Sequence, residues 1–507
     1  MELQHKITSV ISLILATALI FYSSTLEMKS TESAEENGAW YNRSDTIYFW
    51  YSDETMSDYV NKAAVSFGEE NNVHVLPVLI TNDNYLEAIN EASIENNQLP
   101  DAYILGHESL EMAFLAGLAV PIDDPERKCN DKNFSQAALN AVKYNGRTVG
   151  YPLSYDTCAL VYNEDYLHDW AGQKALAILK GEGESFVDGE YFEEIDQLSS
   201  DGSEETDSQE NASADNSSES SSQDAASAEP EVNYDSLSEE EQAAVLAAKT
   251  EEVYQGAIPE TLNELLTIAD SYSAPAGVDG VMSWDVSDIL YNFWIIGDVV
   301  SLGGESGDDR ANLEFNNTKT VNALLRYQYL HHFFNIDSAL NNYDKVISDF
   351  IDGKMIFTIC SVDGVAKLKE AKENGSLEHS YGFAPIPEVD DATLSRSMSM
   401  TEVVVINGYS EKKEIANAFA RYLTCEFSSE LYTRSGKAAC FIGANDGYEN
   451  LSVFDTEYAD SVPLPKIIEL ENFWMELEAM FARVWDGEGV EEQLQGLQDT
   501  VRLFFTR

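Results

Sequence analysis

Strand-like and helix-like segments alternate from residue 45 to residue 106. Short apolar runs predict buried strands, and the segments between them carry apolar residues at helical spacing. This alternation is typical of a doubly wound α/β layer with a mainly parallel sheet. It returns after residue 250, and 507 residues exceed one ordinary core, so two α/β lobes are expected. The segments are DTIYFWYSD, ETMSDYVNKAAVSFGEEN, NVHVLPVLI, NYLEAINEASIENN and PDAYILG.

The charge of the chain argues against several classes of partner. It contains 90 acidic and 30 basic residues, which gives a formal net charge of -60. Nucleic acids and anionic membranes are bound through Lys and Arg, so neither is an expected partner. The five cysteines have no metal-binding spacing, and the common hydrolase, metalloprotease and nucleotide-binding motifs do not occur. We therefore expect no cofactor, no metal site and reduced cysteines.

The N-terminus has the layout of a secretion signal. A basic residue, Lys6, precedes an apolar run from Ile7 to Leu26 that is about long enough to cross a bilayer. Residues 1–28 are interpreted as a signal peptide or signal anchor, and 29–44 as a polar stalk. The remainder is expected on the extracellular side of the cytoplasmic membrane, either anchored by this segment or secreted.

A second unusual segment interrupts the α/β pattern. Residues 182–238 are dominated by Ser, Glu, Asp, Gly and Asn, and contain too few apolar residues to offset the entropy of ordering. We interpret the segment as a disordered acidic insertion. Ser236 or Ser238 is expected to cap the acidic first turn of the helix that follows.

An acidic residue lies inside an otherwise well-formed strand. Asp156 stands within YPLSYDTCALVYNEDYL, residues 151–167. An unpaired buried carboxylate is too costly to keep, so this side chain is expected to line water or a ligand.

Several motifs, in order, resemble one family of proteins. They are LPDAYILGHESLEMAFLAGLAVPID (99–123), YNGRTVGYPLSYDTCALVYNEDYL (144–167), IPETLNELL (258–266) and FIDGKMIFTI (350–359), followed by a C-terminal pair of helical segments. Together they resemble the extracellular solute-binding proteins of ABC importers, in the group typified by maltose-binding protein. The resemblance covers residues 45–507 apart from the insertion.

The resemblance implies a two-lobed periplasmic-binding-protein-like α/β fold of type II. Crossing strands would form a hinge, and a solute would bind in the cleft between the lobes. The first lobe is expected to comprise 40–155 and 384–446, and the second 156–383 and 447–507. The implied activity is capture of a small solute, preferably an oligosaccharide, by a monomer that delivers it to a transmembrane permease. No cysteine precedes Cys129, so the lipid-attachment cysteine of many relatives is missing.

The resemblance also implies cleft residues. Asp156 would point into the cleft from the first crossing strand. Other candidates are Asp53 at the rim of the first lobe, Glu108 and Ser109 in the next turn, Tyr291 and Trp294 as walls of the second lobe, and Trp474 as a stacking platform. Where sugar binders often carry an aromatic residue after the strand 355–359, this chain has Cys360 to Asp363, so one stacking surface is missing.

Each candidate also has a structural interpretation. Tyr291 and Trp294 are at helical spacing, as core aromatic residues often are. Glu108 and Asp53 precede helical segments and are suited to capping them.

Two other functions fit the same residues. A glycoside hydrolase would use two of the many carboxylates as acid and base. A binder of cationic solutes such as polyamines would surround an amine with acids and aromatic walls. The presence of Asp156, Glu108, Asp53 and Asp363 around one pocket would favour a cationic solute over a neutral sugar.

Overall fold

The computed structural model describes residues 46–506, apart from 82–83, 96–97, 188, 194, 196–233, 335, 391 and 449. The predicted signal segment and stalk lie outside the described residues, as does most of the predicted insertion. Among the helices that are described, none is long and apolar enough to cross a membrane.

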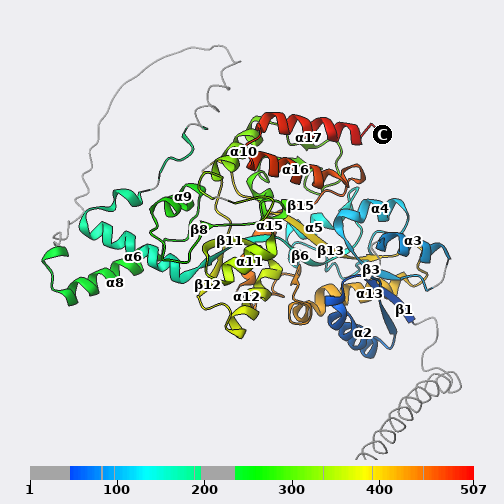
Figure 1. Cartoon of the computed structure of the whole chain (residues 1–507). Coiled ribbons are helices and arrows are strands. Elements are labelled where there is room, and N and C mark those ends of the chain that lie inside the picture. The colour runs from blue at the N-terminus through cyan, green and yellow to red at the C-terminus, as the bar shows by residue number, and fades with distance from the viewer. Residues whose placement is uncertain are drawn as a thin grey trace, which may run out of the picture.

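Two β-sheets organise the chain (Figure 1). The larger sheet has the order β14-β6-β13-β3-β1-β2, and β15 also pairs with β13; the smaller has the order β12-β7-β11-β8. The larger comprises β1 (Thr46–Tyr51), β2 (His74–Leu79), β3 (Ala102–Gly106), β6 (Tyr151–Asp156), β13 (Met398–Ile406), β14 (Ala438–Ala439) and β15 (Val462–Pro463). The smaller comprises β7 (Cys158–Asn163), β8 (Gly280–Met282), β11 (Met355–Ser361) and β12 (Tyr381–Ala384).

Both sheets are mixed, so the expectation of a mainly parallel sheet is wrong. Strand β1 is parallel to β2 and β3, as the strand-helix alternation predicts. Strand β13 is antiparallel to β3 and β6, and β7 is antiparallel to β11 and β12. The reason is topological: β13 enters the larger sheet from the other lobe rather than through a local helical crossover.

Alternating side chains of the larger sheet enter two different cores. Val404 and Ile406 of β13 pack with α2 and α13, whereas Val403 and Val405 pack with α3 and α4. A strand covered on both faces reads as a continuous apolar run, as VVVI does here. The helices of this lobe are α2 (Ser57–Asn71), α3 (Tyr85–Glu95), α4 (Leu110–Leu115), α5 (Gln136–Ala141), α13 (Lys413–Arg421) and α14 (Leu431–Ser435).

The smaller sheet is likewise covered on both faces. Leu160 of β7 belongs to a large cluster that includes side chains of α6, α9, α10, α16 and α17. Val161, its neighbour, packs with α11, α12 and α15 on the other face. These helices are α6 (Glu164–Lys180), α9 (Leu262–Ser271), α10 (Thr318–Leu330), α11 (Tyr343–Ile351), α12 (Val362–Asn374), α15 (Leu451–Asp460), α16 (Phe473–Trp485) and α17 (Val490–Phe504).

The chain passes between the sheets at three places. Between β6 and β7 a single residue, Thr157, separates the last residue of one sheet from the first of the other. The second passage follows β12, but Ile386 and Val389 are still buried in the core of the second lobe. This passage therefore lies close to Met398, about a dozen residues later than the expected boundary at 384. The third follows β15, which pairs with β13 in the larger sheet, and leads to α16 in the second lobe.

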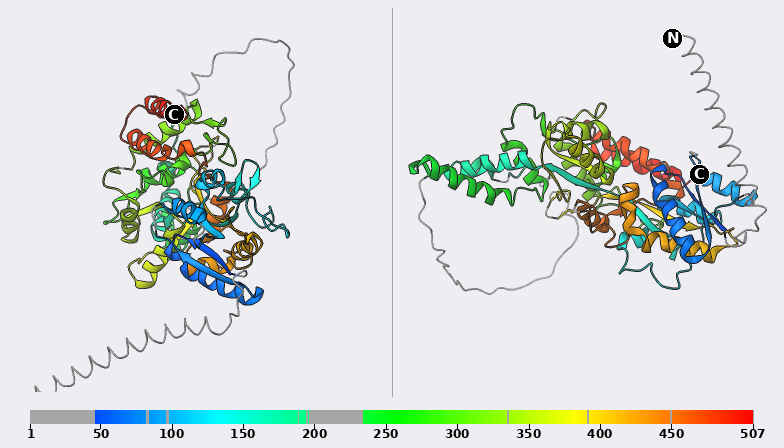
Figure 2. Two further views of the ribbon diagram at one scale, coloured as in Figure 1. Left: turned by 90° about the vertical axis from the view of Figure 1, so that its right-hand side faces the viewer. Right: turned by 90° about the horizontal axis from the view of Figure 1, so that it is seen from below.

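Both ends of the predicted insertion are structured. Phe192 is 3% exposed in the core of the second lobe, and Tyr234 is also buried. The disordered interpretation of 182–238 is therefore too wide, because aromatic side chains anchor its two ends. Ser238, as predicted, caps the next helix, α8 (Glu239–Tyr254), in a capping box with Glu241. Helices α6 and α8 lie side by side and project from the second lobe (Figures 1 and 2).

Candidate functional site

A cavity of about 550 Å³ lies between the two lobes. We call it the interlobe cavity. Its size is in the range of pockets that bind small molecules. The first lobe contributes side chains from the turns after β1 and β3, from β6 and β13, and from the segment before β14. The second contributes the start of α12 and α16. Its lining residues include Asp53, Glu108, Ser154, Asp156, Asp363, Met400, Thr401, Glu402, Lys437 and Trp474.

Asp156 lies where the first crossing strand leaves the larger sheet. It is the last residue of β6, and its Oδ1 accepts a hydrogen bond of 3.0 Å from the backbone amide of Val362. Val362 is the first residue of α12, so the carboxyl group faces the positive end of that helix. Burial, with a smaller contribution from the nearby Asp363 carboxylate, nevertheless raises the pKa of Asp156 to about 7. A carboxyl group in this environment exchanges its proton near neutral pH.

Asp53 and Glu402 share one lysine. The Lys437 ammonium lies 2.8 Å from Asp53 and 3.3 Å from Glu402. Burial by itself would raise the pKa of Asp53, but the hydrogen bonds from Lys437 and Thr55 outweigh burial and lower this pKa. Ser154 donates a hydrogen bond of 2.6 Å to Glu402. These groups form a neutralised polar network along the first-lobe side of the cavity.

Asp363 is also neutralised by a cation. Its carboxylate lies 3.0 Å from Lys367 and accepts hydrogen bonds from Ser361 and Tyr343 at 2.6 and 2.7 Å. Burial opposes ionisation here too, but these donors together lower the pKa of Asp363. Asp363 is therefore ionised at neutral pH.

Glu108 has a different environment. Its side chain is 41% exposed, and its nearest basic neighbour is His107 at 3.8 Å. That histidine is fully buried, and burial lowers its pKa to about 3, so it carries no charge near neutral pH. Although part of the side chain remains exposed, the surrounding cavity residues desolvate the carboxyl group and, with Glu402, raise the pKa of Glu108 against the hydrogen bonds from Ser109 and from its own backbone. Glu108 and Asp156 are thus two acids without a bonded cation among the described residues.

Trp474 is the more exposed of the two aromatic residues that line the interlobe cavity, the other being the buried Tyr155. It follows Phe473, which is 1% exposed and packs in the core of the second lobe. The two rings meet edge to face at 5.3 Å. Phe473 takes the buried position at the start of α16 and leaves the half-buried indole of Trp474 among the cavity residues.

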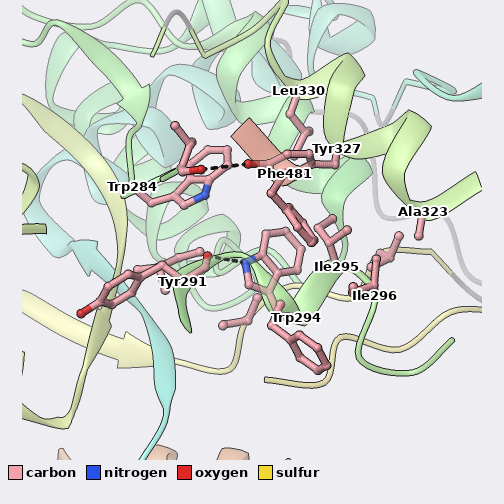
Figure 3. Close-up of a cluster of buried hydrophobic side chains, with 14 of the residues drawn as sticks. Trp284, Tyr291, Trp294, Ile295, Ile296, Ala323, Tyr327, Leu330 and Phe481 are labelled. Carbon is pink, nitrogen blue, oxygen red and sulfur yellow. Dashed lines mark hydrogen bonds between the residues drawn. The ribbon is translucent and has the colours of Figure 1, made fainter. Parts of the chain in front are cut away.

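Trp294 lies in the core, not in the cavity wall (Figure 3). It is 1% exposed, and its indole nitrogen donates a hydrogen bond of 3.0 Å to the carbonyl oxygen of Tyr291. The interpretation as a wall residue is corrected for a local reason. Two 3-10 turns, Ile289–Tyr291 and Phe293–Ile295, carry this stretch through the hydrophobic cluster instead of along a surface helix.

Tyr291 lies behind the cavity. It is 5% exposed, and its ring stacks on that of Tyr343 at 4.7 Å. Its hydroxyl is 3.3 Å from Ser361, which in turn bonds Asp363. Tyr291 therefore positions a lining residue through Ser361 and is not itself part of the surface.

The remaining candidates divide between capping and lining. Asp53 caps the 3-10 turn Glu54–Met56 through Thr55 and also lines the cavity, so both interpretations of this residue apply. Glu108 lines the cavity, and the turn His107–Ser109 that contains it has no side-chain cap. Ser109 precedes α4 and is not a lining residue.

Sequence reasoning missed Glu402 and Lys437. Glu402 is a mid-strand acid in MSMTEVVVI, the same signal that identified Asp156. Met400, two residues earlier on the same face, is 37% exposed within an otherwise buried strand. Lys437 has no comparable signal, because it stands in a loop where lysine is ordinary.

Comparisons with known proteins identify the fold. No family model and no curated protein matches the sequence. Among solved structures, an extracellular solute-binding protein from Staphylococcus aureus in complex with maltose has a TM-score of 0.66 at 16% identity, covering 92% of this chain and 99% of that one. A cyclo/maltodextrin-binding protein complexed with maltotetraose has a TM-score of 0.65 at 15% identity, covering 91% and 97%. This is the two-lobed fold of extracellular solute-binding proteins.

A third structure agrees with the solute-binding fold. A maltose-binding periplasmic protein from Listeria monocytogenes in complex with maltose has a TM-score of 0.63 at 15% identity, covering 92% of this chain and 99% of that chain. The predicted two-lobed α/β fold of type II is thereby confirmed. At these identities the likeness concerns the arrangement of the elements and does not extend to individual side chains.

Proposed function

We propose that the protein captures a small polar solute, in the first place a carbohydrate, in the interlobe cavity. The observation that carries this proposal is the composition of the cavity from both lobes, with Trp474 from one and Asp53 and Glu108 from the other. An indole face suits the apolar C–H surface of a sugar ring, while carboxylates accept its hydroxyl hydrogens. The similar structures with bound maltose and maltotetraose support the same ligand class.

The proposed mechanism is capture by closure. A solute that contacts both lobes stabilises the closed arrangement over the open one by the difference in its contacts. The hinge would consist of Thr157, the segment before Met398 and the segment around β15, where the chain passes between the lobes. The closed monomer would then deliver its solute to the permease of an ABC importer at the extracellular face of the membrane. In this proposal the protein performs no chemistry on the solute.

A binding screen with product analysis tests the proposal. Thermal unfolding of the full chain is measured with neutral oligosaccharides, polyamines and peptides, and the solutes are recovered and analysed by chromatography. We expect an oligosaccharide to raise the unfolding temperature, because a ligand at 100 times its Kd stabilises the folded protein by about 2.7 kcal/mol. We also expect the oligosaccharide to be recovered intact. Cleavage of the oligosaccharide would show that the protein is a glycoside hydrolase and not a binding protein. The absence of stabilisation by any solute would contradict the proposed function.

A further inference from the structure

The charges that line the interlobe cavity are unequal. Its lining includes five carboxylates and one ammonium group, that of Lys437. The carboxylates belong to Asp53, Glu108, Asp156, Asp363 and Glu402. The proposed function already assigns solute binding to this cavity, whose lining comes from both lobes, so the charges bear on which solute it binds.

Three of the five acids already have a cation. Asp53 and Glu402 are bonded to Lys437, and Asp363 is bonded to Lys367. Their paired groups still offer donors and acceptors to hydroxyl groups, as do Ser154 and Thr401 beside them. This part of the lining suits a neutral polyhydroxy compound.

The other two acids have no bonded lysine or arginine among the described residues. The carboxyl group of Asp156 is bonded by the backbone amides of Val362 and Thr157. Lys437 acts on it through space but is engaged with two other carboxylates. The Lys466 ammonium, which acts through space on Glu108, is buried and donates to backbone carbonyl oxygens, and burial lowers its pKa to about 7.

We propose that the natural solute carries a protonated amine on a sugar framework, with the amine bound by Asp156 and Glu108 and the ring against Trp474. The inference rests on the proposed function and names the ligand class of the same cavity. A protonated amine donates three charge-assisted hydrogen bonds, which are roughly twice as strong as neutral ones. It would supply the positive charge that these two carboxylates do not receive from the chain. The amine would also favour their ionised forms.

Isothermal titration calorimetry of the full chain with matched sugars tests the inference. The amine probe is the fully deacetylated glucosamine disaccharide, and its neutral match is the di-N-acetylated disaccharide, with maltose, spermidine and calcium chloride as further probes. We expect the amine disaccharide to bind at least about 10-fold more tightly than each of the others, because a single charged hydrogen bond is worth that factor.

Variants assign the preference to the two acids. Glu108→Gln and Asp156→Asn keep the shape of each side chain and the acceptor for Val362, and each should reduce the preference for the amine at least about 10-fold. Asp499→Asn removes the same charge from an exposed pair with Arg502 and should leave the preference unchanged. Unfolding without ligand shows whether each variant is folded, and the preference ratio is compared only among folded variants.

Each other result overturns the inference in a distinguishable way. Equal or tighter binding of the acetylated disaccharide or maltose would contradict the amine while leaving solute capture in place. If spermidine bound as tightly as the amine disaccharide or more tightly, the sugar framework would be contradicted. If calcium did so, the two acids would be assigned to a metal ion instead of an amine. The absence of binding by all probes would contradict this inference, and the proposed function would then stand or fall on the wider oligosaccharide screen.

Discussion

At the scale of single residues, acids inside strands were the most informative signal. Asp156 and Glu402 interrupt apolar strands, and both line the interlobe cavity. The physical reason is general: a carboxylate in a buried strand needs water, a cation or hydrogen-bond donors, and a cavity between two lobes provides room for all three. Aromatic residues were less informative, because packing and ligand binding both use them.

Trp474 should contribute to ligand binding but not to folding. We predict that Trp474→Ala weakens binding of the solute roughly 10- to 100-fold, because a stacked indole contributes on the order of 1–3 kcal/mol. The unfolding temperature without ligand should change little, since Phe473 holds the start of α16 in the core. Calorimetry and thermal unfolding measure the two effects. Met475→Ala changes the exposed neighbour, which is 62% exposed, and serves as control. A large loss of stability in Trp474→Ala would instead identify the indole as a core residue.

The titration of Asp156 should appear in the pH dependence of stability. Its pKa is about 7 in the folded protein and near 3.8 in the unfolded chain, so the folded state holds a proton that the unfolded state releases. This contribution to stability is present below about pH 4 and is lost as the pH rises through about 7. We predict that, as the pH rises from about 4 to about 7, the free energy of unfolding of Asp156→Asn increases relative to that of the unmodified protein.

Urea unfolding at intervals from pH 4.5 to 7.5 measures this difference. Glu457, whose pKa burial also raises to about 7, contributes in the same direction to both proteins and cancels in the comparison. Asp363 and Lys437, the other charged groups acting on Asp156, are likewise present in both. If the free energies of unfolding of the two proteins changed in parallel with pH, Asp156 would be ionised in the folded protein over the whole range.

At the scale of elements, a hairpin of the second lobe contacts the first lobe. Strands β9 (Ser301–Leu302) and β10 (Leu313–Glu314) form its stem, and its tip carries Arg310. The guanidinium donates to both oxygens of Glu111, at 2.8 and 3.0 Å, and also lies 2.7 Å from Glu469. Glu111, in α4 of the first lobe, is 1% exposed and accepts further hydrogen bonds from Tyr144 and the amide of Ile468. The hairpin therefore forms an ion pair between the lobes, in which the carboxylate is buried and the guanidinium is partly exposed.

Removing this arginine should destabilise the protein. We predict that Arg310→Met lowers the free energy of unfolding by about 2 kcal/mol, because it leaves Glu111 buried with fewer donors. The expected loss is smaller than for a fully buried pair, since Arg310 is 39% exposed. Arg502→Met, which breaks an exposed pair with Asp499, should cost less than about 0.5 kcal/mol. Equal losses in the two variants, measured by urea unfolding, would show that the interlobe pair contributes nothing particular.

At the scale of the whole molecule, the two lobes are joined by three passages of the chain and by one buried cluster, in which Tyr155 and Ala438 of the first lobe pack with Val161 of the second. Few covalent links and a solvent-accessible cavity between the lobes are the conditions for hinge motion. The net charge of -60 bears on solubility and on the sign of the ligands that approach, and does not specify the fold.

Ligand binding should make the molecule more compact. We predict that a solute found in the binding screen reduces the radius of gyration of the full chain, because the closed arrangement brings the lobes together. Small-angle X-ray scattering with and without saturating solute measures the change. Trp474→Ala, at the same solute concentration, should show a smaller reduction because fewer molecules are occupied. Binding without any change in scattering would show that the lobes do not move.

The sequence by itself determined the element types, the two-lobed class and the acid of the first crossing strand, Asp156, because these follow from local periodicity, chain length and the cost of burying charge. Only the tertiary structure decided which of two tryptophans lines the interlobe cavity. The tripeptide Asn-Phe-Trp occurs at 292–294 and again at 472–474. Both phenylalanines are buried, yet Trp294 is enclosed by the second-lobe core while Trp474 lines the cavity. The difference arises from the segments that pack around each indole, and those segments are distant in the sequence.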